Sequence, residues 1–240
     1  PLFRSQVLGV TGPVASGKST LGRTFLCEYP YEGSIRYNGC ELRNAADNVR
    51  SGIISYLGHD PELFNDSVRN NVLLGDDYDV FEYLRAVCMD KEVEAMEQGA
   101  DTIIGSEGIR LSGGQAQRIA LARTLCHKKL VLVLDDPFSA LDRNTEEQIY
   151  KKLKDMASDN IVILISHRLY MFPKMDKVIW MDAGKANVGT HKELMLECPG
   201  YRKMYETVSV EECRAVETEN EGLAAAKVVE NSRRVVDKHE

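Results

Sequence analysis

Two apolar runs, each five residues long, form the clearest hydrophobic pattern in the chain. They cover 130–134 and 161–165 and contain no charged residue. Continuous apolar runs of strand length are typical of parallel strands covered on both faces. Between them, apolar residues from Ile149 to Met156 recur at helical spacing, which predicts a helix over 144–156. This order of elements predicts a βαβ unit.

The N-terminal pattern is a further apolar strand followed by a helix. The apolar run from Val7 to Val10 ends at a glycine-rich loop over 12–17, and a helix is predicted over 18–27. Strand, glycine-rich loop and helix in this order open a nucleotide-binding α/β unit.

The rest of the chain adds hairpins, helices and a charged tail. The predicted elements are a hairpin over 34–42 around Asn38-Gly39, a strand over 53–57, helices from about 66 to 125 with loops near Gly75 and over 99–110, and an edge hairpin over 178–188. Charges crowd and aromatic residues are missing over 210–240, so this tail is expected to be disordered or loosely helical and dispensable for nucleotide binding. We therefore expect an α/β domain over 1–209, with a helical subdomain over about 62–125.

Composition narrows the class of protein. The 240 residues include 30 Lys and Arg against 37 Asp and Glu, a net charge of −7. Proteins that bind nucleic acid usually have more Lys and Arg than Asp and Glu, so no nucleic-acid partner is expected. The six cysteines form no CxxC pair and are expected to be buried, reduced side chains. No apolar run approaches a membrane span, and no signal peptide is visible.

The glycine-rich loop carries the first chemical motif. Its residues fit GxxxxGK[ST], the phosphate-binding P-loop, and are Gly12, Pro13, Val14, Ala15, Ser16, Gly17, Lys18 and Ser19, with Thr20 next. Backbone N–H groups of such a loop bind phosphate oxygens, and glycines permit the close approach. Lys18 is expected to reach the β- and γ-phosphates, and the Ser19 hydroxyl to ligate Mg²⁺. The motif predicts a site for ATP and Mg²⁺.

Two further motifs extend this site. The strand over 131–134 ends in Asp135, which suits the Walker B role of holding Mg²⁺ or its water, although strands often end in Asp. A predicted helix begins at a Ser and two glycines, which form a second anion site. The residues of this motif are Leu111, Ser112, Gly113, Gly114 and Gln115.

Together these motifs resemble the nucleotide-binding domains of ATP-binding cassette (ABC) transporters, over roughly 7–206. The P-loop, the LSGGQ signature, the Walker B strand, a Ser139-Ala140-Leu141-Asp142 D-loop and His167 stand in the order and spacing of that family. The resemblance implies a P-loop ATPase core with a helical signature subdomain. It also implies catalytic roles for Asp136, His167 and His59, with His59 a further metal ligand.

The family forms head-to-tail dimers, so the resemblance implies that Ser112 and Gly114 touch a nucleotide held by a partner subunit. Asp142 is then expected to line the dimer interface. Without the resemblance, Asp142 would be expected to cap the N-terminus of a helix, a role for which Asn144 and Thr145 are alternatives.

Within the family, the segments 56–64, 67–71 and 104–108 resemble exporter-type members, in which they face the membrane domain. Without the resemblance, surface loops are an alternative interpretation of these segments. The implied partners are a transmembrane permease domain and a second ABC domain, with the chain peripheral at the cytoplasmic face of the membrane. A start at Pro1 instead of Met allows the chain to be a piece of a longer polypeptide.

Three departures from the family pattern affect the expected chemistry. The family usually has Gln, which contacts Mg²⁺ and the attacking water, where His59 stands; His differs in shape and donor pattern. The usual catalytic Glu is Asp136 here, and misplacing a catalytic group by ~1 Å can cost ~10²-fold in rate. Only eleven residues precede Gly12. No residue can therefore be assigned to stack on adenine, and an incomplete N-terminal antiparallel β-subdomain is expected.

The same Asp occurs in one half-site of some asymmetric exporters, so a hetero-dimer with a second ABC domain is expected. The function that the sequence favours is an exporter ATPase. One rival is a soluble ABC protein acting on DNA or the ribosome, which the acidity and the exporter-like segments disfavour. The other is a regulatory cassette that binds ATP without turning it over. The transported substrate leaves no signal here, because specificity resides in the membrane domain.

Overall fold

The computed structural model describes residues 6–105, 108–156 and 158–208. Within these ranges the chain forms a six-stranded sheet of order β10-β9-β1-β8-β7-β4. Its strands are β1 (Gln6–Thr11), β4 (Ile54–Leu57), β7 (Val131–Asp135), β8 (Ile161–Ile165), β9 (Lys177–Asp182) and β10 (Lys185–Gly189). All neighbouring strands pair in parallel except β10, which pairs antiparallel with β9 at one edge. The predicted α/β class and its mainly parallel sheet are thereby confirmed.

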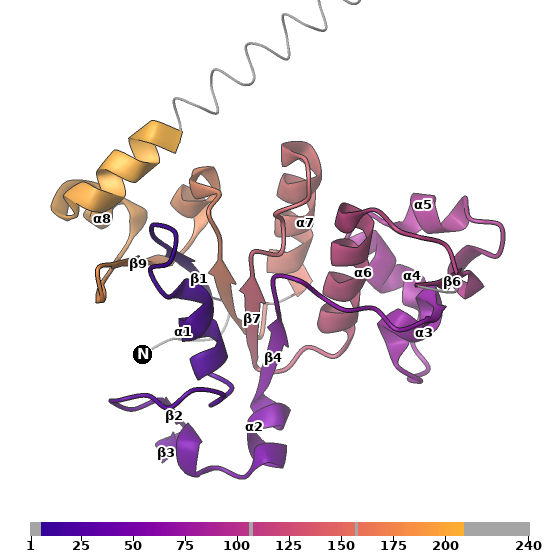
Figure 1. Ribbon diagram of the computed structural model, residues 1–240, viewed down its shortest axis with the longest axis horizontal. Coiled ribbons are helices and arrows are strands. Elements are labelled where there is room, and N and C mark those ends of the chain that lie inside the picture. Colours follow the sequence, from indigo (N-terminus) through magenta and orange to yellow (C-terminus); the bar gives the residue numbers. More distant parts are fainter. Residues whose placement is uncertain (1–5, 106–107, 157, 209–240) are drawn as a thin grey trace, which may run out of the picture.

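Helices surround this sheet (Figure 1). They are α1 (Lys18–Thr24), α2 (Asp47–Ile53), α3 (Val68–Leu73), α4 (Val80–Ala86), α5 (Asp90–Glu94), α6 (Gly113–Cys126), α7 (Arg143–Met156) and α8 (His191–Glu197), followed by helical residues over 199–208. Short 3₁₀ segments cover Leu42–Asn44, Gly99–Asp101 and Leu169–Lys174. The predicted βαβ unit is present as β7, α7 and β8.

The alternation of side chains along β7 explains why both faces of the sheet are covered. Leu132 and Leu134 belong to one buried cluster, which includes residues of α6 and α7. Val133, between them, belongs to the second cluster, against which Leu21 and Phe25 from the α1 region pack. The central strands are therefore apolar on both faces, and their carboxyl ends are held rigidly at one edge.

A group of helices, α3 to α6, lies beyond β4 at one end of the sheet (Figure 1). A two-stranded sheet of β5 (Asp66–Ser67) and β6 (Ile103–Ile104) accompanies them. The helical character of this region follows the sequence pattern, while the proposed subdomain limits near 62 and 125 stay a prediction, as does the 1–209 domain. The tail predicted over 210–240 lies outside the described residues.

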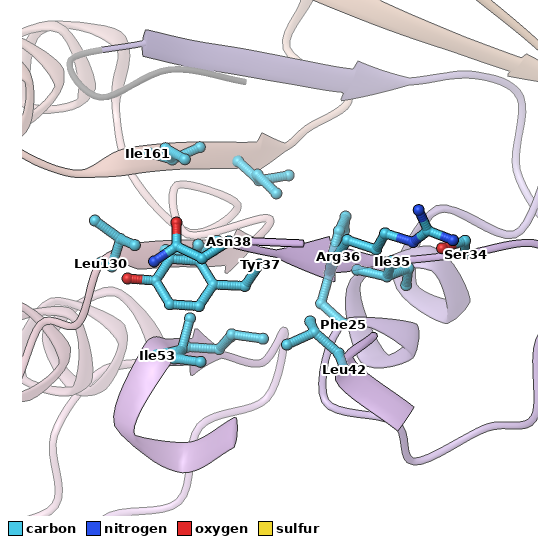
Figure 2. A pocket seen from close by; sticks show the side chains of 13 residues that line it. Phe25, Ser34, Ile35, Arg36, Tyr37, Asn38, Leu42, Ile53, Leu130 and Ile161 are labelled. Atoms are coloured by element: carbon cyan, nitrogen blue, oxygen red, sulfur yellow. The ribbon is translucent and has the colours of Figure 1, made fainter. Parts of the chain in front are cut away.

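A separate hairpin joins β2 (Arg36–Tyr37) to β3 (Cys40–Glu41), as the Asn38-Gly39 turn predicts. Asn38 and Gly39 have φ of 48° and 81°, the left-handed values that such a turn requires. A cavity of about 580 Å³ opens between this hairpin and the amino ends of β4, β7 and β8 (Figure 2). Among the described residues no third strand joins the hairpin, which fits the expected incomplete β-subdomain.

Some expectations need correction. The helix predicted over 18–27 ends at Thr24, and Ile53 belongs to α2 instead of the strand. The cysteines were expected to be buried, but of the five described ones, all free thiols, Cys198 is buried and Cys40 is exposed. Within the described ranges, none of the helices has the length and apolarity needed to cross a bilayer.

Candidate nucleotide site

The phosphate loop connects the carboxyl end of β1 to α1. Gly17, the N-cap of α1, has a left-handed φ of 92°. A Cβ on Gly12 would lie 2.0 Å from the carbonyl oxygen of Met181, so this position accepts only glycine. Because Gly17 has no side chain, the N–H groups of the first helical turn are left for a ligand. Ser19 and Thr20 are exposed in that turn.

The Lys18 side chain lies back across the loop and is buried. Its ammonium donates to the carbonyl oxygens of Gly12 and Pro13 at 3.0 and 2.8 Å, and to Ser16 Oγ at 3.4 Å. Val14, at the tip of the loop, is 88% exposed. The cation is thus held at the centre of the loop, where a phosphate could replace the carbonyl oxygens as its partner.

The carboxyl ends of β7 and β8 place charged side chains beside this cation. Asp135 ends β7 opposite Ile165, and His167 follows β8 by two residues. Burial lowers the pKa of Lys18, against the nearby charges of Asp135 and Asp136, which raise it. Burial also lowers the pKa of His167, and the charge of Lys18 acts in the same direction. The structure therefore gathers these predicted site residues at one edge of the sheet; their roles stay predictions.

Asp136 and His59, the two departures from the family pattern, face each other. Asp136 Oδ2 lies 3.7 Å from His59 Nδ1. The backbone of Asp136 has a φ of 50°, in the left-handed region that Asp tolerates better than most residues. Burial raises the pKa of its carboxyl group, opposed by the charges of His167, His59 and Arg168. The candidate base therefore faces an imidazole in place of the usual amide.

The donor set near the loop suits Mg²⁺ bound together with phosphates. Within the described ranges, no three His, Cys, Asp or Glu side chains form a cage for a metal ion. Mg²⁺ in nucleotide sites typically takes one or two protein oxygens and completes its shell with phosphate and water. The Ser19 hydroxyl and the Asp135 carboxylate supply hard oxygen donors of this kind, whereas a His59 nitrogen is a softer ligand.

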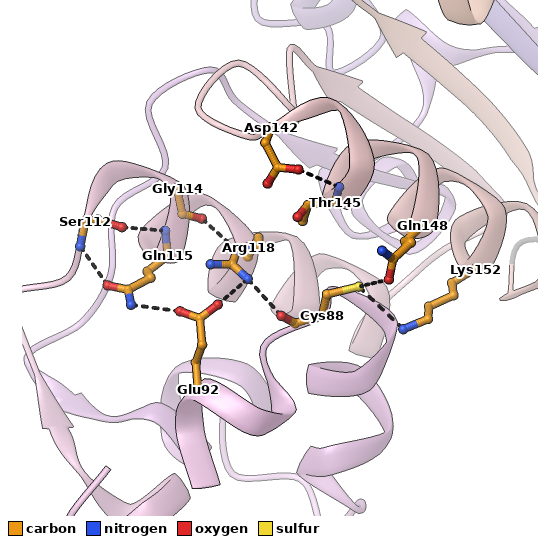
Figure 3. A network of polar contacts seen from close by, with 10 residues as sticks. All are labelled: Cys88, Glu92, Ser112, Gly114, Gln115, Arg118, Asp142, Thr145, Gln148 and Lys152. Carbon is orange, nitrogen blue, oxygen red and sulfur yellow. Dashed lines mark hydrogen bonds and ion pairs between the residues drawn. The ribbon is translucent and has the colours of Figure 1, made fainter. Parts of the chain in front are cut away.

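The signature segment begins α6 with a complete capping box (Figure 3). Ser112 Oγ accepts from the Gln115 N–H at 3.2 Å, and Gln115 Oε1 accepts from the Ser112 N–H at 2.9 Å. Gln115 Nε2 donates to Glu92 of α5 at 2.9 Å, and Arg118 pairs with the same carboxylate at 2.7 Å. Because Ser112 Oγ accepts its helix N–H, its own proton stays available for an external oxygen.

The two signature glycines serve different purposes. A Cβ on Gly114 would lie 2.8 Å from the carbonyl oxygen of Ala140 in the D-loop, so close packing requires this glycine. A Cβ on Gly113 would meet no described atom within 4 Å. The open side of Gly113 therefore fits the expectation that another molecule approaches the signature there.

The D-loop is held from both sides. From α6, Gln117 Nε2 donates to the Asp136 carbonyl oxygen at 2.9 Å and to Ser139 Oγ at 3.0 Å. From the segment after β8, Arg168 donates to the Ser139 carbonyl oxygen at 3.1 Å and to the fully buried Glu146 at 2.8 Å. These bonds tie the acidic end of β7 to both the signature helix and the His167 segment.

Asp142 is an N-terminal cap of α7. Its Oδ1 accepts from the Thr145 N–H at 3.0 Å, and the side chain of Thr145, followed by this N–H, lowers the pKa of the carboxyl group. The prediction that Asp142, and not Asn144 or Thr145, caps this helix is thus confirmed. The expected place at a dimer interface stays a prediction.

Within one chain the signature and the phosphate loop do not meet. Figure 1 places α6 beyond β4, while α1 lies at β1 on the other side of β7. The chain therefore offers two separate half-sites, one built around Lys18 and the other around Ser112.

Sequence patterns did not reveal several residues that support these half-sites. Tyr56 donates its hydroxyl to Asp135 Oδ2 at 3.1 Å, although 79 positions separate them. Gln117 is a buried polar residue on the apolar face of α6, and a polar residue among apolar positions is the sequence signal that could have identified it. No sequence pattern marks Glu92 and Arg118 as partners, because their pairing depends on how α5 packs on α6.

The sequence of this chain is similar to those of known proteins. The family model described as "ABC transporter" matches residues 2–139. The probable multidrug resistance ABC transporter ATP-binding/permease protein YheI of Bacillus subtilis is 34% identical over 209 residues, which cover 85% of this chain and 36% of that protein. The multidrug resistance-like ATP-binding protein MdlA of Escherichia coli is 34% identical over 206 residues, covering 83% of this chain and 35% of that protein.

A solved structure shares the fold. A bacterial Atm1-family ABC exporter with ATP bound superposes with a TM-score of 0.80 at 30% identity, covering 85% of this chain and 37% of that one. The chain thus spans little more than a third of the length of these relatives. The order of its motifs, the separation of its half-sites and these matches lead to one conclusion: the chain belongs to the ABC transporter family and carries its ATP-binding part.

Proposed function

We propose that this chain binds and hydrolyses ATP as part of an ABC exporter, working at the cytoplasmic face of a membrane. The observation that carries the proposal is the gathering of Lys18, Asp135, Asp136 and His167 beside a loop with open N–H groups. Relatives of this region are ATP-binding/permease proteins, so ATP turnover would drive transport through a separate membrane domain.

The chemistry follows from the described side chains. The loop N–H groups and Lys18 would bind the phosphates, and Ser19 and Asp135 would hold Mg²⁺, which supplies charge neutralisation on the phosphate oxygens. Asp136 would accept a proton from the attacking water, and His167 would orient the terminal phosphate. The raised pKa of Asp136, caused chiefly by burial, makes its carboxylate a better base than an exposed one.

The membrane domain would contact the region around α3. Phe64 is 59% exposed, Leu74 52% and Tyr78 55%. The backbone beneath Phe64 is fixed by the fully buried Asn71, which donates to the Phe64 carbonyl oxygen at 3.0 Å and accepts from its N–H at 2.8 Å. Exposed apolar side chains on a fixed backbone suit a protein partner, and this segment resembles the exporter type.

A second candidate function is favoured by the position of His59 beside Asp136. In it this chain is the ATP-holding member of a hetero-dimer, whose intact signature completes the hydrolytic site of a different ABC subunit. The 3.7 Å separation of His59 Nδ1 from Asp136 Oδ2 supports this alternative, because the shorter carboxylate faces an imidazole where the family usually has an amide.

Nucleotide titration by calorimetry tests the proposal. Lys18→Ala removes the cation that opposes the terminal phosphates, so tight MgATP binding should be lost, with affinity falling at least ~100-fold. Lys185→Ala, on the exposed edge strand β10, is the matched control and should bind as the unmodified chain does. Equal affinity in Lys18→Ala and the unmodified chain would contradict the P-loop assignment.

Co-purification tests the membrane partner. A tagged chain expressed with the coding sequence of a neighbouring permease should bring that permease down from detergent-solubilised membranes. Leu74→Lys, in the exposed apolar region, should weaken this recovery and leave ATP affinity unchanged. If the chain binds ATP but no membrane domain co-purifies with it, the result would favour a soluble ABC protein instead.

A further inference from the structure

Tyr56 connects two parts of the proposed site that are far apart in sequence. It lies on β4, where it stands opposite Val133 of the neighbouring β7. Its hydroxyl donates to Asp135 Oδ2 at 3.1 Å. Asp135 is only 3% exposed, so its orientation depends on protein groups more than on water.

The fold makes room for this ring beneath α1. A Cβ on Gly22 would lie 2.8 Å from Ile165 Cδ1 and 3.3 Å from Tyr56 Cε2, so a larger residue would displace the ring. The guanidinium of Arg23, next along α1, has a raised pKa, caused chiefly by its hydrogen bond to Tyr29 and further by the nearby Tyr56 hydroxyl. The phenol is therefore held between the helix that follows the phosphate loop and the strand that ends in Asp135.

The phenol is a hydrogen-bond donor at neutral pH. The ordinary pKa of a tyrosine hydroxyl is about 10, so the proton stays on the oxygen. A donor fixed on one carboxylate oxygen restricts rotation of the carboxylate and leaves the other oxygen free of that bond. Carboxylates that ligate metals are typically oriented by such partners, and losing the partner typically costs 10–100-fold in metal affinity or activity.

We propose that Tyr56 is a positioning residue that fixes Asp135 Oδ2 and thereby orients the second oxygen, Oδ1, toward Mg²⁺ bound with ATP. This inference rests on the proposed nucleotide site and adds a residue that the motifs do not contain. We therefore expect Tyr56 to affect the affinity for Mg²⁺ and not the binding of the phosphates, because its hydroxyl contacts the Walker B carboxylate and not the phosphate loop.

Tyr56→Phe tests the assignment, because it keeps the ring that packs against Gly22 and removes only the hydroxyl. ATP affinity of the full chain is measured by calorimetry with Mg²⁺ and again in excess chelator. Tyr56→Phe should weaken the Mg²⁺-dependent part of ATP affinity about tenfold and leave the metal-free affinity unchanged. Electron paramagnetic resonance with Mn²⁺ and a non-hydrolysable ATP analogue should show the same loss of metal affinity.

Tyr29→Phe is the matched control. Tyr29 is 41% exposed and its hydroxyl accepts from the same Arg23 at 3.3 Å, so the variant removes a phenol hydroxyl from this arginine without touching Asp135. It should bind Mg²⁺ with ATP as the unmodified chain does. Equal weakening with and without Mg²⁺ in Tyr56→Phe would overturn the positioning role, and so would unchanged Mg²⁺ dependence. An unmodified chain that does not bind MgATP would instead overturn the proposed nucleotide site itself.

Discussion

The two half-sites of this chain differ in how completely their own residues define them. The signature half-site is fixed: Ser112 and Gln115 form a closed capping box, and Glu92 holds Gln115 through a further hydrogen bond. The phosphate half-site contains an ammonium bound to its own loop carbonyls and a carboxylate paired with an imidazole.

This difference separates the two tasks of an ABC domain. A preorganised signature needs little rearrangement to meet a nucleotide, which suits completion of a partner's site. The phosphate half-site keeps the residues proposed to bind ATP, but Asp136 and His59 stand where the family usually has the Glu and Gln of hydrolysis. The two half-sites therefore differ as the second candidate function requires, with an intact signature beside an altered phosphate site.

Among the effects expected on the reconstituted complex, the largest loss of activity comes from blocking the signature. Ser112→Arg places a bulky cation at the open start of α6 and should remove at least ~90% of the ATPase activity of the complex reconstituted with a partner subunit, about 1.4 kcal/mol or more in barrier. If the second candidate function holds, Asp136→Asn should reduce that activity less than about twofold, because the Asp136 site would contribute little turnover.

Ser51→Arg, on the exposed face of α2, controls for the added charge and should leave activity unchanged. The chain's own MgATP affinity, measured alone, should be the same in Ser112→Arg and in the unmodified chain. Loss of most turnover in Asp136→Asn would show that Asp136 is a working base and that the two half-sites are equally competent.

A gain of activity is expected when the altered residues are exchanged for those usual in the family. His59→Gln with Asp136→Glu frees the carboxylate from the imidazole and lengthens it by one methylene, so turnover should rise, within the ~10²-fold limit set by ~1 Å of placement. The left-handed φ of 50° at Asp136 opposes part of this gain, because Glu tolerates it less well.

The same exchange in a Lys18→Ala background is the control for this gain. Turnover there should stay at the level of Lys18→Ala alone, since the restored base would have no nucleotide to act on. A gain that survives without Lys18 would place the extra turnover in the partner's site.

Glu146 provides a test of the segment that joins the half-sites. Burial raises its pKa to about 7, despite Tyr170 and Arg168, which act to lower it. A folded-state pKa above the unfolded value of an acid means that the folded chain keeps the proton longer. This contribution to stability is complete below the unfolded pKa of about 4.5 and is lost as pH rises toward 7.

Glu146→Gln should therefore flatten the decline in unfolding free energy between pH 4.5 and 7, by an order of ~2–3 kcal/mol. Urea denaturation at several pH values measures this slope. Glu147→Gln is the matched control: Glu147 is half-exposed and pairs with Arg143 and Lys174 at the surface. The same slope in Glu146→Gln and the unmodified chain would mean that Glu146 stays ionised in the fold.

Regular patterns made much of this molecule predictable from its sequence. The apolar runs of β7 and β8 and the Asn38-Gly39 turn are local signals, and each predicted its element. The P-loop and signature motifs predicted where Lys18 and Ser112 would stand. The bonds that join Tyr56 to Asp135 and Gln117 to the D-loop could not be predicted, because they depend on strand register and on helix packing between distant segments.

The smallest expected effect concerns the support of the signature by α5. Burial would raise the pKa of Glu92, but hydrogen bonds from Arg118 and Gln115 lower it overall, so the carboxylate is charged when it holds α6. Glu92→Gln keeps the size of the side chain and removes its charge opposite Arg118. Because Glu92 is partly exposed, the loss in unfolding free energy should be about 0.5–1 kcal/mol.

ATPase activity of the reconstituted complex should fall only a few-fold in this variant, since the capping box between Ser112 and Gln115 remains. Glu94→Gln, an exposed neighbour on the same helix, removes an equal charge and should change neither stability nor activity. Circular dichroism melts and steady-state ATPase assays measure both effects. A loss of activity as large as that of Ser112→Arg would mean that α5, and not the capping box, fixes the signature. The contrast between a preorganised signature and an altered phosphate half-site would then depend on how helices pack and not on the motif itself.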